Sequence, residues 1–93
     1  MKKLTKEWIK KAENDFIVAK KEYDSDSPIY DAICFHYQQC LEKYLKAILQ
    51  EKKVFFEKTH DLDVLAEKVK QFIPKISNYK KKLIELSAFA VEI

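Results

Sequence analysis

The chain has 93 residues, of which 47% are hydrophobic and 35% charged, a balance that excludes a disordered protein and predicts one domain over residues 1–93. All 18 basic residues are lysines and exceed the 15 acidic residues by three, an excess too small to indicate a strong nucleic-acid footprint. Glycine is absent and proline occurs twice, so a fold built from many tight β-hairpins is disfavoured.

The first predicted element is a helix from Thr5 to Tyr23. Its apolar residues recur at helical spacing along one stripe: Trp8, Ile9, Ala12, Phe16, Ala19 and Tyr23. Residues 24–28 form the clearest break in the sequence. Ser27 suits the N-cap position there, and Pro28 suits the first position of the next helix.

The second predicted helix, from Pro28 to Lys52, is the longest element. Its main apolar stripe comprises Ile33, Tyr37, Cys40, Leu41, Tyr44 and Ile48, and Phe35, Leu45 and Leu49 lie off that stripe. A helix that is apolar on more than one side is expected to lie centrally or to meet a second subunit.

A connection over residues 53–60 follows, and its apolar group, Val54, Phe55 and Phe56, is expected to tuck under the bundle. Thr59 is the predicted N-cap of a third helix, which carries Leu62, Leu65, Val69 and Phe72 and ends near Pro74. A fourth helix is predicted from about residue 75, with Ile76, Tyr79, Leu83, Leu86, Ala90 and Ile93. Its pattern stops without a cap, so we expect relatives to continue further. Four helices with short connections predict an all-α, antiparallel up-and-down four-helix bundle.

Two features predict where the protein is found. Cys34 and Cys40 lie six residues apart on one predicted helix, too far along its axis for a disulfide. Unpaired thiols and the absence of a secretory pattern favour the reducing cytoplasm. No run approaches the roughly 18 apolar residues of a membrane span, so no membrane partner is expected.

The first candidate site lies on the second helix. His36, Gln39 and Lys43, with Cys40 beside them, share one strip that borders the apolar stripe. An imidazole, an amide and an ammonium group there would suit a phosphate or a nucleotide. In the alternative interpretation they are ordinary boundary residues, with Lys43 a solvated charge.

The second candidate site is at the start of the third helix. Lys58 and His60 flank a predicted helix N-terminus, where free N–H groups and the helix dipole favour an anion. The alternative is a capping motif around Thr59, and Asp61 and Asp63 already complement the dipole.

Other polar groups favour structural roles. Glu13 and Asp15 point to opposite sides of their helix, which predicts separate ion pairs with lysines of another helix or subunit. Metal-binding spacings are missing, and Cys40 with His36 is a weak candidate for a nucleophilic pair. Residues 80–82, three consecutive lysines, are predicted to be a solvated surface that could steer a nucleic acid.

Three strings resemble the prokaryotic HEPN domain family: AENDF over residues 12–16, DAICFHYQQCLEKYLKA over residues 31–47 and KTHDL over residues 58–62. The resemblance implies a bundle of four or five helices, often a homodimer. It also implies nucleotide binding and a minimal nucleotidyltransferase as partner, in some cases as a toxin–antitoxin pair. Many relatives are metal-independent ribonucleases that use an Arg followed, after four to six residues, by a His. This sequence contains no Arg, which disfavours that activity.

The sequence therefore predicts a HEPN-type nucleotide- or partner-binding module rather than an enzyme, with a nucleotide or RNA as ligand and neither cofactor nor metal. The residues predicted to contact the ligand are His36, Gln39, Lys43, Lys58 and His60. Two alternatives stay open. One is a HEPN ribonuclease or toxin. The other is a purely structural subunit whose exposed apolar residues, Phe35, Leu45, Leu49 and Phe55, form a protein interface.

Overall fold

The computed structural model describes residues 1–82, which form three α-helices and one 3₁₀ helix, and no β-strand occurs among them. In chain order the elements are α1 (Lys3–Tyr23), α2 (Tyr30–Glu51), α3 (Leu62–Val69) and the 3₁₀ helix η1 (Pro74–Tyr79). The predicted all-α class is confirmed. The part of the predicted fourth helix beyond residue 82 lies outside the described residues.

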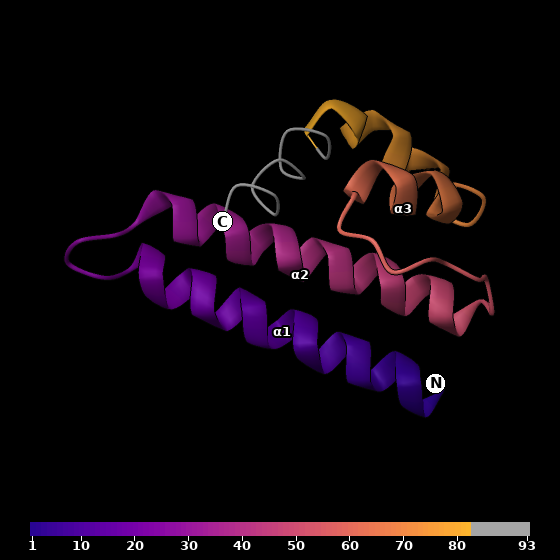
Figure 1. The fold of residues 1–93 in the computed structure, drawn as a ribbon, viewed down its shortest axis with the longest axis horizontal. Coiled ribbons are helices and arrows are strands. Elements are labelled where there is room, and N and C mark those ends of the chain that lie inside the picture. The colour runs from indigo at the N-terminus through magenta and orange to yellow at the C-terminus, as the bar shows by residue number, and fades with distance from the viewer. Residues whose placement is uncertain (83–93) are drawn as a thin grey trace.

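Helix α2 is the central element, as its apolar residues on several sides predicted. Helices α1 and α2 form an antiparallel pair, and α3 with η1 lies on the other side of α2 (Figure 1). No helix among residues 1–82 is both long and apolar enough to cross a membrane.

The start of α2 differs from the prediction. The N-cap is Ile29 and the first helical residue is Tyr30, so the predicted roles of Ser27 and Pro28 are wrong. The turn is organised instead by Glu22, whose Oε2 accepts a hydrogen bond of 3.1 Å from the Ile29 backbone N–H. The Ser25 hydroxyl also donates to the Glu22 backbone carbonyl oxygen, at 2.7 Å.

The limits of α3 also differ from the prediction. Asp61 is the N-cap, and its side chain accepts hydrogen bonds from the backbone N–H groups of Asp63 and Val64. The predicted cap, Thr59, lies two residues earlier and accepts from the Asp61 N–H at 3.1 Å. The helix ends at Val69, before the predicted end near Pro74, and Ile73, which precedes that proline, lies outside the helical conformation.

The hydrophobic core lies between α2 and α3. Its buried members are Leu45, Leu49, Leu62, Leu65, Ala66 and Val69, and Ile48, Val54, Phe56 and Ile76 pack against them. Leu45 and Leu49 are 5% and 0% exposed, so their predicted role in an exposed interface is wrong. Phe55, offered for the same interface, is 77% exposed.

The main apolar stripe of α2 is only partly covered by the described residues. Leu41 and Tyr44 of that stripe are exposed, and so is Phe16 of α1. An open hollow of about 450 Å³ lies beside this stripe, lined by Met1, Thr5, Ile9, Tyr44, Ala47, Ile48, Glu51, Lys52, Phe72 and Ile73. The stripe is therefore divided: Ile33 and Cys40 are buried and Ile48 packs against the core, whereas Leu41 and Tyr44 stay exposed.

Candidate ligand-binding site

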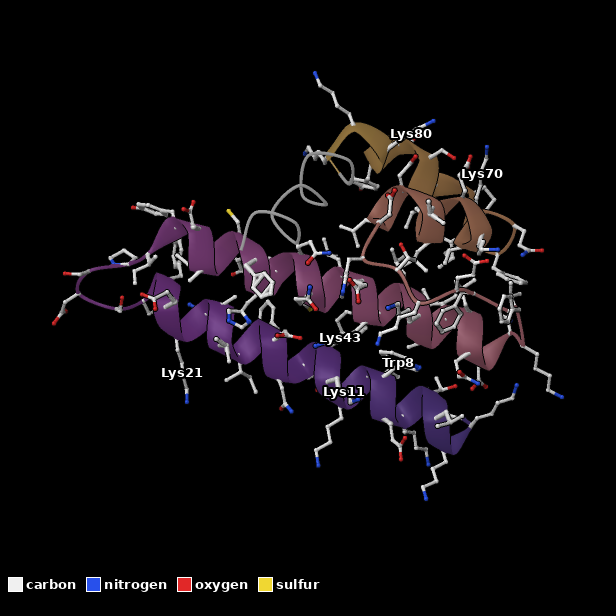
Figure 2. The ribbon with its side chains drawn as sticks, in the orientation of Figure 1. Trp8, Lys11, Lys21, Lys43, Lys70 and Lys80 are labelled. Carbon is white, nitrogen blue, oxygen red and sulfur yellow. The ribbon has the colours of Figure 1, made fainter. Side chains whose placement is uncertain are left out.

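A cluster of three polar side chains joins α1 to α2. Oδ1 of Asp15 lies 3.0 Å from Nδ1 of His36. Oδ2 of the same carboxylate accepts a hydrogen bond from the Lys43 ammonium group. The three side chains are 13%, 30% and 22% exposed, respectively. Lys43 lies between the two helices (Figure 2). His36 and Lys43 therefore converge, and Asp15 makes the interhelical ion pair that the sequence suggested for it.

A second cluster joins α2 to the segment that precedes α3. Glu42 is buried, and its Oε1 lies 2.8 Å from Nδ1 of His60. Its other oxygen, Oε2, accepts a hydrogen bond of 3.0 Å from Lys46 Nζ. The Lys46 ammonium also lies 5.4 Å from the centre of the Trp8 ring, a cation–π contact with α1. The side chain of His60 is 60% exposed, so this cluster reaches solvent at the imidazole.

Two adjacent amides of α2 extend the second cluster toward the first. Gln38 donates from Nε2 to the His60 backbone carbonyl oxygen at 3.1 Å, and Gln39 Nε2 donates to Gln38 Oε1 at 2.8 Å. Gln39 also lies on the same strip of α2 as His36 and Lys43. We call the two neighbouring clusters, together with these amides, the polar network: Asp15, His36, Gln38, Gln39, Glu42, Lys43, Lys46 and His60.

The structure thus brings four of the five predicted contact residues into one network, and the fifth, Lys58, is exposed and takes no part in it. Sequence reasoning missed Gln38, Glu42 and Lys46. Their four-residue spacing places them on one side of α2, next to the buried leucines of the core. The sequence did contain a sign of their importance, because charged and amide side chains are unusual on the side of a helix that carries core leucines.

Each imidazole in the network is held by a carboxylate through Nδ1. An ionised carboxylate favours a proton on Nδ1, so Nε2 of His36 is the ring nitrogen available to a ligand. Lys43 has three N–H donors and Asp15 occupies one of them. An anionic ligand could therefore receive hydrogen bonds from Lys43, from protonated His36 and from the Gln39 amide without breaking the Asp15 contacts.

Cys40 does not form a nucleophilic pair with His36. The thiol is buried, and burial raises its pKa, with a smaller effect in the same direction from the Asp15 charge. A buried, protonated thiol is a poor nucleophile. Within residues 1–82, no three His, Cys, Asp or Glu side chains come together to hold a metal ion.

Comparison with known proteins places the chain in a family. The HEPN domain model matches residues 5–93, and this range includes the three strings that carry the resemblance. No curated protein and no solved structure matches the chain. The match covers nearly the whole sequence, and we conclude that the chain belongs to the HEPN domain family.

Proposed function

We propose that this chain is a HEPN-type binding module that takes a nucleotide, or another ligand carrying a phosphate group, at the polar network. The observation that supports this most directly is the meeting of His36 and Lys43 on the Asp15 carboxylate. In this proposal the module works as a homodimer, with a minimal nucleotidyltransferase, or with both.

Asp15 acts in the proposed site as a positioning residue. It holds an imidazole and an ammonium group at fixed places about two turns apart on α2, so less side-chain freedom is lost when a phosphate binds. Lys43, His36 and Gln39 then supply donors to the phosphate oxygens. The negative charge of Asp15 keeps the affinity moderate, which suits a ligand that is bound and released.

Isothermal calorimetry with ATP and GTP tests this proposal. We expect Lys43→Ala to weaken binding by about 1–3 kcal/mol, the usual loss for one charge-assisted hydrogen bond. The matched control is Lys21→Ala, an exposed lysine of α1 outside the polar network (Figure 2). Circular dichroism should first establish that both variants are folded. Binding of neither nucleotide by folded wild-type protein, or equal losses in the two variants, would refute the nucleotide site.

The homodimer part of the proposal rests on the partly covered apolar stripe of α2. The occupant we favour is a second copy of the chain, because a small domain gains stability by covering exposed apolar residues in a dimer. A two-fold contact pairs the same surface from both copies, so Tyr44→Glu would place a carboxylate in it twice. Light scattering should show a dimer that this variant converts to monomer. Wild-type protein that stays monomeric throughout the micromolar range would refute the proposed homodimer.

A ribonuclease is the second candidate function, and the proposed availability of His36 Nε2 is the feature that favours it. The absence of Arg from the whole sequence weighs against it. Cleavage of RNA by the purified protein, compared with a His36→Ala variant, decides the matter. Equal background from both proteins rules the activity out.

A further inference from the structure

The positive charge of this protein is concentrated in one short segment. Residues 1–67 contain twelve lysines and thirteen acidic residues, so this part of the chain is close to neutral. Residues 68–82 contain six lysines and no acidic residue, and residues 83–93 contain two acidic residues. The small net charge of +3 therefore hides a segment with a charge of +6. Such asymmetry is typical of a surface that meets a polyanion.

The fold presents five of these lysines to solvent. Lys70, Lys75, Lys80, Lys81 and Lys82 are all exposed, and we call them the lysine surface. Lys70, which follows α3, and Lys80, which follows η1, line the same small hollow. Both lie at the outer edge of the molecule, on the side of α3 and η1 that faces away from α1 (Figure 2).

Acidic side chains limit where an anion can approach. Asp63 and Glu67 of α3 line the same hollow as Lys70 and Lys80. A phosphate in the hollow would be repelled by these carboxylates. A strand that runs along η1 and the residues after it would instead meet Lys75 and Lys80–Lys82, and residues 75–82 contain no acidic side chain. The favoured contact is therefore along η1.

The chemistry of this segment favours a nucleic acid over a membrane. A membrane-binding helix must turn apolar residues toward lipid, but Val69 is buried and Ile76 packs against the core. Two exposed apolar residues of the segment, Phe72 and Ile73, line the apolar hollow beside Tyr44 and not the small hollow at the lysine surface. The segment also holds an exposed aromatic residue, Tyr79, which is 55% exposed and directly precedes Lys80. An aromatic face beside several lysines is the combination by which proteins hold single strands, because a base stacks on the ring and phosphates pair with the ammonium groups.

We infer that the lysine surface binds single-stranded nucleic acid, with Lys75, Lys80 and Lys82 on the phosphates and Tyr79 under a base. Lysine is a point charge that reads no base edge, so the contact has little sequence preference. This surface shares no residue with the polar network. The inference therefore stands or falls separately from the proposed nucleotide site.

Fluorescence anisotropy with labelled single strands of about 12 nucleotides, one RNA and one DNA, tests the inference. The triple variant Lys75→Gln, Lys80→Gln and Lys82→Gln should bind at least about tenfold more weakly than wild type. The slope of log affinity against log salt should become shallower by about 0.7 for each phosphate that no longer pairs with a lysine, about 2 in all. Tyr79→Ala should weaken binding by about fivefold or more, and Tyr79→Phe should keep most of it.

The matched control removes three exposed lysines from α1 by Lys3→Gln, Lys10→Gln and Lys21→Gln. It lowers the net charge equally and should bind within about twofold of wild type, with an unchanged salt slope. Lys43→Ala should also bind strands normally, which separates this surface from the polar network. Equal losses in the two triple variants would overturn the inference. So would failure of folded wild-type protein to bind either strand at low salt while it binds phosphatidylserine vesicles.

Discussion

Asp15 of α1 and Lys43 of α2 lie 28 residues apart in the sequence and meet as a carboxylate and an ammonium group. The second oxygen of the same carboxylate receives His36. Within residues 1–82, both ion pairs that join α1 to α2 therefore end on Asp15. This side chain therefore ties the two long helices together at the polar network, beside the apolar contacts between them.

Asp15→Asn should lower the free energy of unfolding by about 1–3 kcal/mol, because Lys43 and His36 lose their anion in a largely buried place. Urea unfolding followed by circular dichroism measures the change. Glu13→Gln, two residues away and exposed, is the control and should change stability by less than about 0.5 kcal/mol. Similar values for the two variants would mean that Asp15 is not an interhelical clamp.

Leu49→Ala should destabilise the fold by about 2–5 kcal/mol, because Leu49 is fully buried between α2 and α3 and its truncation leaves a cavity. Phe55→Ala should cost less than about 0.5 kcal/mol, since that ring is exposed. Thermal or urea unfolding of the two variants provides the comparison. A loss for Phe55→Ala as large as that for Leu49→Ala would place Phe55 in a contact that residues 1–82 do not make.

Glu51 should make stability depend on acid. The backbone N–H of Lys2 donates to its carboxylate at 3.1 Å and holds the pKa of Glu51 below its ordinary value of 4.5. The folded chain then binds fewer protons at this group than the unfolded chain, so the contribution is present above pH 4.5 and is lost as the pH falls through the folded pKa.

Glu51→Gln should accordingly lower the melting temperature at neutral pH, with the difference from wild type shrinking below pH 4.5. Differential scanning calorimetry across that range measures it. Glu57→Gln, an exposed carboxylate near the end of the connection to α3, should leave the melting temperature unchanged at every pH. A deficit for Glu51→Gln that persists in acid would point to poorer packing rather than to the carboxylate's charge.

The two thiols should differ in reactivity. Cys34 is half-buried, whereas Cys40 is buried and burial raises its pKa. Iodoacetamide at mildly alkaline pH should therefore alkylate folded Cys34 at least roughly tenfold faster than Cys40. Mass spectrometry of Cys34→Ser and Cys40→Ser variants separates the two rates, and unfolding in urea should make them equal. Equally fast alkylation in the folded state would contradict the burial of Cys40.

Helical periodicity was sufficient to place α1 and α2 to within two residues at each end and to predict that α2 is central. It could not identify which apolar residues of α2 are covered by the rest of the fold. Tyr44 belongs to the best-defined stripe and stays exposed, whereas Leu49 lies off that stripe and is fully buried. When a helix is apolar on two sides, the covered side depends on where the later elements pack, and a period of 3.6 residues carries no such information.

The caps show a similar limit. Ser27 and Thr59 are good capping residues in isolation, but the turns are organised by Glu22 and Asp61. A carboxylate a few residues away competes for the same backbone N–H groups. Which side chain accepts those hydrogen bonds depends on the path of the turn and not on the capping preference of the residue alone.

For the site, a shared strip on one helix was enough to group His36, Gln39 and Lys43, because such grouping needs only helix geometry. Glu42 and Lys46 could not be assigned in the same way. Their importance depends on His60, which reaches α2 from a segment that has no periodic pattern. A contact between a helix and an irregular segment is set by tertiary packing alone.

Helices α1 and α3 each pack against α2 and, among residues 1–82, not against each other. Asp15 of α1 binds His36 and Lys43 of α2, and His60 binds Glu42 of α2, so the ion pairs from both flanks end on the same helix. Helix α2 is thus the common support of the two flanks, and a substitution that loosens one of them should leave the ion pair of the other in place.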